Sequence, residues 1–325
     1  SRKGRSRRAM KIVSRAFAVV LVGVAGALAS RAARAQEAPV VSPTPLRFTV
    51  DSDGHPMAVW ARRPAQPVGS VLLVHGRTWS SLPDFDLQVP GLRRSVMVSL
   101  AARGLAAYAV DLRGYGATPR DGTGWLTPDR AASDVLNVLD WIAAQAPSLP
   151  PPALVGWSRG AAIAMLAAEA APSKISSLVL FGFAYDPAAR FVDEAAPARP
   201  PMIRNTADDT RSDFISPKVT PPAVVRAFTT QALRSDPIAA DVKGDAELNA
   251  IVPSTMLTPT LVLFGERDPG VRPEDAARLF ARLGTSDKQL VVLPGADHAA
   301  QLEDTHDAWI ATVAAFIKRH VAGAK

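Results

Sequence analysis

Short, continuously apolar runs alternate with amphipathic stretches along most of this chain, beginning near residue 70. Residues 70–75 are almost uninterruptedly apolar, which is typical of a strand buried on both faces of a parallel sheet. Residues 129–145 follow a Thr-Pro helix-start signal and repeat apolar side chains at helical spacing, which indicates an amphipathic helix. The same patterns predict strands over residues 46–50, 57–61, 106–110, 177–181, 260–264 and 289–293, a short strand that ends near residue 156, and helices over residues 92–103, 161–171, 273–282 and 304–321.

The order of these elements predicts the architecture. Strands that alternate with helices around six parallel strands form a doubly wound α/β sheet. The first two strands flank a polar turn and form a hairpin, in which we expect His55 to be a solvated loop residue. The alternation breaks down over the proline-rich residues 182–259, which are too long and too patterned for a simple loop and predict a helical cap inserted after the sixth strand. We therefore divide the chain into an export signal (1–35), a linker (36–45), a core in two parts (46–182 and 259–325) and a cap (183–258).

The basic charge of the chain is concentrated in its first 35 residues. They hold nine Arg or Lys, no acid and an apolar run of fourteen residues, which is too short to span a bilayer comfortably and precedes an A-x-A cleavage site before Gln36. Without them the net charge falls from +7 to −2, so we expect neither a nucleic-acid partner nor stable membrane association after cleavage. We predict an exported protein, periplasmic or secreted, that uses the Sec route or, given Arg7 and Arg8, the twin-arginine route. The alternatives are an uncleaved N-terminal anchor and a start at Met10.

The pattern G-x-S-x-G at residues 156–160 has a mechanical cause. A serine on a sharp strand-to-helix turn adopts a strained conformation, and a side chain two residues to either side would collide with the turn. The turn lifts the hydroxyl of Ser158 clear of the sheet and points the following N–H groups, at a helix N-terminus, toward the space above it. The segment therefore predicts a nucleophile at Ser158.

A nucleophilic serine needs a base, and the base needs a carboxylate that fixes its tautomer. If Ser158 is the nucleophile, an acid and a histidine should follow it in the chain, each just after a strand. Asp268 and His298 satisfy this condition, and the carboxyl ends of their strands should meet that of the serine strand in one crevice. Asp186, after the sixth strand, is the alternative acid, whereas Asp297 adjoins His298 too closely to orient it.

Five short motifs follow one another in the chain: HGR at 75–77, DLRGYG at 111–116, GWSRG at 156–160, GERD at 265–268 and GADH at 295–298. With them the chain resembles the capped α/β-hydrolase superfamily, of the epoxide hydrolase, haloperoxidase and esterase type. The resemblance implies an α/β-hydrolase fold with Ser158 as nucleophile, Asp268 as acid and His298 as base. It also implies an oxyanion hole made by the backbone N–H groups of Arg77 and Arg159. Epoxide hydrolases place aspartate at the elbow, so the serine favours acyl transfer to water.

The side chains around this predicted site have two interpretations each. The guanidinium groups of Arg77 and Arg159 could bind an acidic substrate or simply point into solvent, and we favour the second. Arg113 in the DLRGYG motif is expected to form a structural ion pair rather than to clamp substrate. Three tryptophans are candidates to line the substrate pocket, although packing in the core is the simpler expectation for each: Trp79, Trp125 and Trp157.

The function that these observations predict is an exported serine hydrolase that cleaves esters of small to medium apolar acyl groups. An amidase, a cofactor-free perhydrolase and an acyltransferase that use the same triad are the alternatives within enzymes. A catalytically inactive binding protein is the alternative outside them. We expect a small-molecule ester as the partner and neither a metal nor an organic cofactor, and the chain has no cysteine, which excludes disulfides and thiol catalysis.

Overall fold

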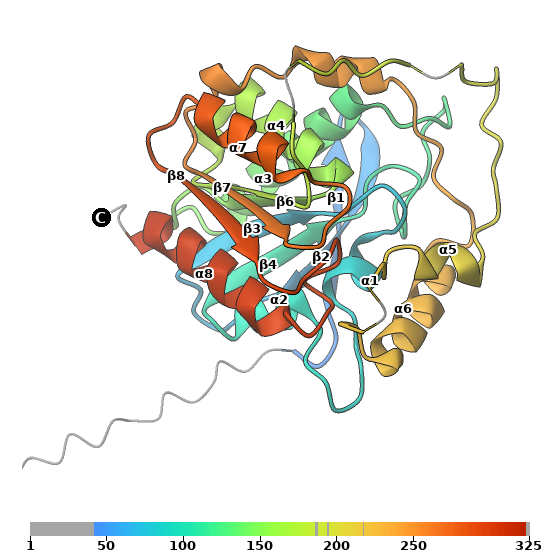
Figure 1. Ribbon diagram of the computed structural model, residues 1–325, viewed down its shortest axis with the longest axis horizontal. Helices are drawn as coiled ribbons and strands as arrows, with labels where there is room; N and C mark the ends of the chain where they lie inside the picture. The colour runs from blue at the N-terminus through green and yellow to red at the C-terminus, as the bar shows by residue number, and fades with distance from the viewer. Residues whose placement is uncertain (1–41, 186–187, 194, 217, 323–325) are drawn as a thin grey trace, which may run out of the picture. The chain divides into compact units, whose positions relative to one another are not determined.

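A computed structural model describes residues 42–185, 188–193, 195–216 and 218–322. These residues form an eight-stranded sheet in the order β1-β2-β4-β3-β5-β6-β7-β8, flanked by helices on both faces (Figure 1). The six strands from β3 to β8 run parallel, and β1 and β2 form an antiparallel hairpin at one edge, as predicted. The strands are β1 (Leu46–Ser52), β2 (His55–Arg62), β3 (Gly69–Val74), β4 (Leu105–Val110), β5 (Ala153–Trp157), β6 (Leu178–Phe181), β7 (Thr260–Gly265) and β8 (Lys288–Leu293).

The continuously apolar strands are buried on both faces, for the reason that the sequence indicated. In β3, Leu72 and Val74 point into one hydrophobic cluster, whereas Val71 and Leu73 point into another on the opposite side of the sheet. All four side chains are fully buried. Strands of this kind need helices on both faces to exclude water from their side chains, and helices are present on both faces.

Helices cover the two faces in separate groups (Figure 1). One face carries α3 (Pro128–Gln145), α4 (Arg159–Ala170) and α7 (Pro273–Arg282), and the other carries α2 (Val96–Ala101) and α8 (His306–Ala322). The predicted start of α3 is confirmed: the Thr127 side chain accepts a hydrogen bond from Arg130 N–H, and proline follows at the first helical position.

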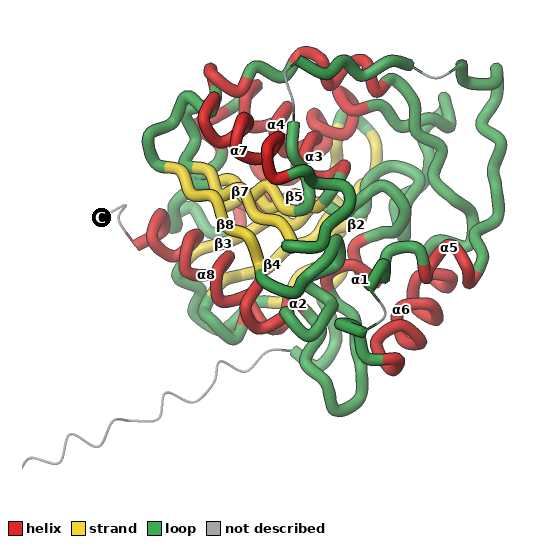
Figure 2. The backbone as a smooth tube through the Cα atoms, viewed as in Figure 1, coloured by secondary structure: helices red, strands yellow, loops and turns green. Residues whose placement is uncertain are grey.

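The chain between β6 and β7, residues 182–259, consists largely of loops with short helices (Figure 2). Its elements are α5 (Ala207–Arg211), α6 (Pro222–Ser235) and two 3-10 helices, Asp245–Ala250 and Pro253–Thr255. The α6 helix buries Val224, Phe228 and Ala232, and the Phe228 ring meets the rings of Trp79 and Phe214 edge-on. We call residues 182–259 the β6–β7 segment.

Several local predictions were wrong. The predicted helix at 92–103 begins only at Val96, because the Ser95 side chain accepts from Val98 N–H and caps it there. The α4 helix begins at Arg159 rather than 161, directly after Ser158. His55 is the first residue of β2 rather than a solvated loop residue, and its Nε2 lies 2.9 Å from the Pro119 carbonyl oxygen. The sequence pattern also missed the short helix α1 (Ser81–Phe85).

The predicted export signal and most of the predicted linker lie outside the described residues. Within the part of the chain that is described, no helix combines the length and the apolarity that crossing a bilayer requires.

Candidate active site

Ser158 stands at a strained turn between β5 and α4. Its backbone has φ +55° and ψ −123°, a conformation that side chains rarely adopt, and it is one of three such non-glycine residues among those described. The strand and the helix meet without a loop, so the serine precedes the first turn of α4, whose N–H groups have no intrahelical acceptor. The predicted elbow is present.

The two glycines that flank the serine are required by close packing of the backbone. A Cβ on Gly156 would lie 2.3 Å from the Gly160 carbonyl oxygen, and a Cβ on Gly160 would lie 2.4 Å from the carbonyl oxygens of Val74 and His75. Real Cβ atoms essentially never come so close to a backbone oxygen. The collision with the turn that the sequence predicted is confirmed at Gly156, whereas a side chain at Gly160 would collide with the end of β3.

His298 and Asp268 meet above the ends of β7 and β8. The Nδ1–H of His298 donates a hydrogen bond of 2.9 Å to Oδ2 of Asp268. The Asp268 side chain is fully buried and that of His298 is 18% exposed. The loop after β7, which carries Asp268, and the loop after β8, which carries His298, approach closely because β7 ends in Gly265. A Cβ on Gly265 would lie 2.3 Å from the Asp297 carbonyl oxygen. The alternative acid, Asp186, lies outside the described residues.

Trp157 fixes the His298 loop from the strand side. Its indole Nε1–H donates to the His298 carbonyl oxygen at 2.9 Å, and the two rings lie 5.5 Å apart. The tryptophan itself is 2% exposed and stacks on Phe181 of β6. The residue that precedes the elbow serine thus also holds the histidine backbone.

Opposing effects set the charge state of His298. Burial lowers its pKa, but the hydrogen bond to Asp268 and the negative charges of Asp268, Asp213 and Asp297 outweigh burial and leave the pKa above its ordinary value. The imidazolium is therefore stabilised, as a base that takes up a proton during a reaction requires.

The other buried histidines have structural partners. Leu112 N–H donates to Nε2 of His75, so the remaining ring proton lies on Nδ1, which faces the Gly76 carbonyl oxygen at 2.9 Å. His306, at the start of α8, lies within hydrogen-bond distance of the Ser99 hydroxyl and the Gln301 carbonyl oxygen. Neither histidine is needed to explain a reaction at Ser158.

Asp297 does not bond to the histidine that it precedes. It is fully buried, and its Oδ2 accepts from Ser216 N–H of the β6–β7 segment at 2.6 Å. Glu303 lies next to it and accepts from Asp297 N–H at 2.9 Å. Burial, together with the neighbouring Asp297 carboxyl, raises the pKa of Glu303 to about 9, so this carboxyl is protonated at neutral pH.

A small cavity of about 140 Å³ joins Ser158 to His298. Two of its lining side chains, Asp84 of α1 and Asp213 of the β6–β7 segment, were missed by the sequence analysis. Neither stands in a motif, and Asp84 had only its position soon after the HGR motif to suggest a role. Among the predicted pocket residues, Trp79 and Trp157 line this cavity and are also packed in the core. The full lining is Gly76, Arg77, Thr78, Trp79, Asp84, Trp157, Ser158, Asp213 and His298.

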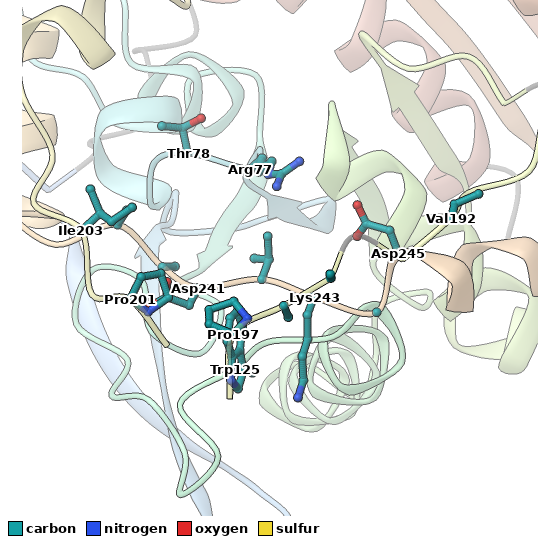
Figure 3. Close-up of a pocket in the computed structure, with 16 residues that line it drawn as sticks. Arg77, Thr78, Trp125, Val192, Pro197, Pro201, Ile203, Asp241, Lys243 and Asp245 are labelled. Atoms are coloured by element: carbon teal, nitrogen blue, oxygen red, sulfur yellow. The ribbon is translucent and has the colours of Figure 1, made fainter. Parts of the chain in front are cut away.

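A wider cavity of about 490 Å³ shares two lining residues, Arg77 and Thr78, with the small one (Figure 3). Its other walls are the Trp125 ring and apolar and charged residues of the β6–β7 segment. Figure 3 shows the Arg77 guanidinium and the Asp245 carboxylate turned toward the same space, with the Lys243 ammonium directed away from it. The Lys243 ammonium instead lies 5.3 Å from the centre of the Trp125 ring.

The two arginines of the predicted oxyanion hole differ. The favoured expectation that Arg159 points into solvent is wrong: its side chain is 9% exposed and forms an ion pair with Asp245 of the β6–β7 segment. Arg77 is exposed, and within the described chain neither its guanidinium nor its N–H has a hydrogen-bond partner. The Arg77 carbonyl oxygen accepts from the Tyr115 hydroxyl, which anchors the loop after β3.

Arg113 has the structural role that was predicted. It forms ion pairs with Asp134 at 2.8 Å and with Asp121 at 3.3 Å, and its side chain is 7% exposed.

Nothing in the described residues groups three or more His, Asp or Glu side chains in an arrangement that could hold a metal ion.

A family model described as serine aminopeptidase, S33, matches residues 65–305. The chain belongs to this family of α/β hydrolases. It is therefore a hydrolytic enzyme with an α/β-hydrolase fold, as the sequence motifs implied.

Solved structures agree with this S33 family assignment at the level of the fold. A Vigna radiata epoxide hydrolase mutant is 15% identical, covers 86% of this chain and 100% of its own, and has a TM-score of 0.62. E-2-(acetamidomethylene)succinate hydrolase is 21% identical, covers 84% of this chain and 99% of its own, and has a TM-score of 0.59. The thioesterase domain from the curacin biosynthetic pathway is 18% identical (84% and 99%, TM-score 0.59). No curated protein matches the chain.

Proposed function

We propose that this chain is an exported serine hydrolase that cleaves carboxylic esters, with Ser158 as nucleophile, His298 as general base and Asp268 as the acid that orients it. The observation that carries the proposal is the 2.9 Å hydrogen bond between His298 and Asp268, because both the histidine and the strained Ser158 line one cavity. A base that is oriented by a carboxylate and faces an elbow serine is the arrangement that nucleophilic acyl transfer requires.

In the first half of the reaction, the Ser158 hydroxyl oxygen attacks the ester carbonyl carbon while Nε2 of His298 takes the hydroxyl proton. The oxyanion that forms accepts from the backbone N–H groups of Arg77 and Arg159, each of which contributes about 3 kcal/mol to the transition state. The carbon–oxygen bond to the alcohol then breaks, and the imidazolium returns its proton to the departing oxygen. The products of this half are the free alcohol and an acyl-Ser158 ester.

In the second half, a water molecule attacks the acyl carbon and gives one proton to His298. The bond between the acyl carbon and the serine oxygen breaks, and Ser158 recovers the proton from the imidazolium. The carboxylic acid leaves, and the enzyme returns to its starting state. Asp268 stays ionised throughout and stabilises the imidazolium that forms twice in each cycle.

The test is to treat the chain from Gln36 onward with a fluorophosphonate, locate the adduct by mass spectrometry, and measure hydrolysis of p-nitrophenyl esters of graded acyl length. We expect the adduct on Ser158, and a loss of turnover of at least about 10⁴-fold in Ser158→Ala. Ser286→Ala, which alters an exposed serine with no hydrogen bond among the described residues, is the matched control and should behave as wild type. Turnover by Ser158→Ala at the wild-type rate would refute the proposal.

Amide hydrolysis by the same groups is the second candidate, because the family description names an aminopeptidase. An ester and an anilide of the same acid, compared on the same enzyme sample, separate the two. We expect the ester to be cleaved with the higher kcat/KM, and the opposite order would favour the amidase.

Export is the remaining part of the proposal, and its support is the basic, apolar and A-x-A pattern of residues 1–35. Expression of the full chain followed by N-terminal mass spectrometry of the periplasmic and culture fractions tests it. A mature protein that begins at Gln36 is expected in one of those fractions, and an intact N-terminus in the cytoplasm would exclude cleavage.

A further inference from the structure

The small cavity beside Ser158 holds three buried polar atoms that have no hydrogen-bond partner among the described residues. They are Oδ1 of Asp84, Oδ2 of Asp213 and the indole Nε1–H of Trp79. Asp84 is fully buried and Trp79 is 1% exposed. Buried polar groups are almost always hydrogen-bonded, so three unpartnered ones around one cavity indicate that bound molecules supply the missing partners, water in the free enzyme and a ligand group when substrate binds.

Asp84 and Trp79 are each held in place by a second contact with the protein. The second carboxyl oxygen of Asp84 accepts from Gly76 N–H at 3.3 Å, which places Asp84 directly behind the loop that carries the proposed oxyanion donor. Trp79 is held by its edge contact with Phe228 of α6. The indole N–H lies near enough to Asp213 to lower the pKa of that carboxyl, but the two groups do not reach hydrogen-bond geometry.

The two carboxyl groups are close enough to affect each other. Burial raises the pKa of Asp84 well above its usual range, and the charge of Asp213 raises it further. Burial raises the pKa of Asp213 to about 6, against the opposing effect of His298. Ionisation of Asp213 therefore makes ionisation of Asp84 less favourable.

A hydroxyl group matches this set of atoms better than the alternatives do. It donates one hydrogen bond, which a carboxyl oxygen accepts, and it also accepts one, which the Trp79 N–H can donate. An ammonium group has donors alone, so it would leave the Trp79 N–H unpartnered. An alkyl group would leave all three atoms unpartnered.

The sizes of the two cavities indicate which part of the ester the hydroxyl belongs to. The small cavity, at about 140 Å³, has Ser158 in its wall and holds only a short group, whereas the wider one, at about 490 Å³, opens beyond Arg77 and Thr78. A short acyl group fits the first and a larger alcohol fits the second.

We infer that the small cavity is a subsite for a short acyl group with a hydroxyl close to the ester carbonyl, recognised by Asp84, Asp213 and Trp79. The inference rests on the proposed ester hydrolase activity and replaces the apolar acyl group that the sequence favoured. The preferred substrates are then esters of short hydroxy acids, and hydrolysis releases the hydroxy acid and the alcohol.

Three benzyl esters with acyl groups of one shape and the same leaving group test the inference: those of 2-hydroxypropanoic, 2-methylpropanoic and 2-aminopropanoic acid. Each kcat/KM is divided by the rate constant of hydroxide hydrolysis of the same ester, because an α-hydroxyl raises intrinsic reactivity. We expect the hydroxy ester to exceed the methyl ester at least tenfold, because a site built to bind a hydroxyl discriminates strongly against an analogue that lacks it. The amino ester should fall below the hydroxy ester.

Variants of Asp213 show whether the subsite causes the preference. In Asp213→Leu the ratio of hydroxy to methyl ester should fall toward one, and in Asp213→Asn, which keeps the shape of the side chain, it should fall at least threefold. Asp208→Leu removes a carboxylate from the same segment that is 89% exposed, and it should leave the ratio at the wild-type value. The fluorophosphonate adduct on Ser158 is measured in every sample.

A labelled Ser158 together with equal or faster hydrolysis of the methyl ester would overturn the subsite and leave the serine hydrolase intact. A labelled enzyme that prefers the amino ester would overturn the assignment to a hydroxyl. An enzyme that neither labels at Ser158 nor hydrolyses any of the esters would overturn the proposed function and this inference with it.

Discussion

The carboxyl ends of the strands and the β6–β7 segment contribute to the same site by different physical means. At the strand ends, backbone packs against backbone: Gly156 and Gly160 have no room for a Cβ, and Gly265 has none against the His298 loop. The β6–β7 segment contacts the core through many side chains and through a few backbone hydrogen bonds, such as those that join Asp241 and Lys243 to Leu126. The Asp236 carboxylate accepts from the N–H and hydroxyl of Ser80, and Asp245 pairs with Arg159.

We infer from this difference that the strand ends carry the catalytic groups and that the β6–β7 segment determines which substrates fit. Groups at the strand ends cannot move without a backbone collision, so they suit the nucleophile, base and acid, whose geometry a reaction must hold closely. Asp213 and most residues of the wider cavity lie on the β6–β7 segment, where substitutions change the cavity lining and leave the elbow in place. Changes at the strand ends should therefore affect the rate of every substrate, and changes in the segment should affect the choice among substrates.

The largest expected effect is that of Asp268→Asn. The asparagine amide can donate to Nδ1 of His298 and so favour the wrong tautomer, and it lacks the charge that stabilises the imidazolium, so kcat should fall about 10³- to 10⁴-fold with little change in KM. Turnover of one p-nitrophenyl ester measures both constants. Glu274→Gln removes an exposed carboxylate from α7, close to Asp268 in the chain, and should keep wild-type rates.

A near-normal kcat in Asp268→Asn, with the hydrogen bond to His298 intact by NMR, would show that another carboxyl orients the base. Asp186 would then be the first residue to replace. This outcome would also weaken the contrast between the two regions, because Asp186 belongs to the β6–β7 segment.

The next effect is on stability. In Gly160→Ala the added Cβ meets the carbonyl oxygens of Val74 and His75, which belong to β3 and the loop after it and cannot give way easily. We expect the free energy of unfolding to fall by about 3 kcal/mol, from overpacking of the backbone. Gly122→Ala is the matched control, since no atom lies within 4 Å of its Cβ position.

Urea unfolding followed by circular dichroism measures both glycine variants. A Gly160→Ala protein as stable as Gly122→Ala would mean that the elbow can shift away from β3, and that the strand ends are not the rigid part of the site. At a temperature where Gly160→Ala is folded, any fall in its kcat/KM should be the same for every substrate.

The sequence predicted the rigid region well and the other region poorly, and the reason is physical. The strands from β3 to β7 are buried on both faces, and the glycines of the elbow are required by sterics, so the apolar pattern and the motif both predict them. Asp213 follows a helix of five residues in a segment that tertiary contacts hold in place, and no local period marks it. Asp84 lies in a short helix that the pattern did not show at all.

Arg159 illustrates the same limit within the motif itself. The G-x-S-x-G spacing located its backbone at the start of α4, which is a local property. Its side chain pairs with Asp245, which is distant in the sequence and comes from the β6–β7 segment. The motif therefore located Arg159 directly after the elbow serine, but the favoured direction of its guanidinium was wrong.

The smallest expected effect is a shift in the pH dependence of activity, because Asp213 of the β6–β7 segment changes the pKa of His298. The base must be neutral to act, and its pKa lies above the ordinary value of about 6.5, so kcat/KM should fall as the pH drops through that raised pKa. Part of the elevation comes from the negative charge of Asp213, which is ionised in this range because its own pKa is about 6. Asp213→Asn removes that charge, so the acid limb of the profile should move to lower pH.

The profile of kcat/KM against pH for the 2-methylpropanoate ester measures this shift, because that ester has no group of its own that titrates. Asp208→Asn, which removes an exposed charge from the same segment, should leave the limb where wild type has it. A limb that moves to higher pH in Asp213→Asn would mean that the substitution exposes His298 to water, because weaker burial raises the pKa of an imidazole. The segment would then act on the base mainly through solvent exclusion, since the burial that it provides lowers the pKa of His298.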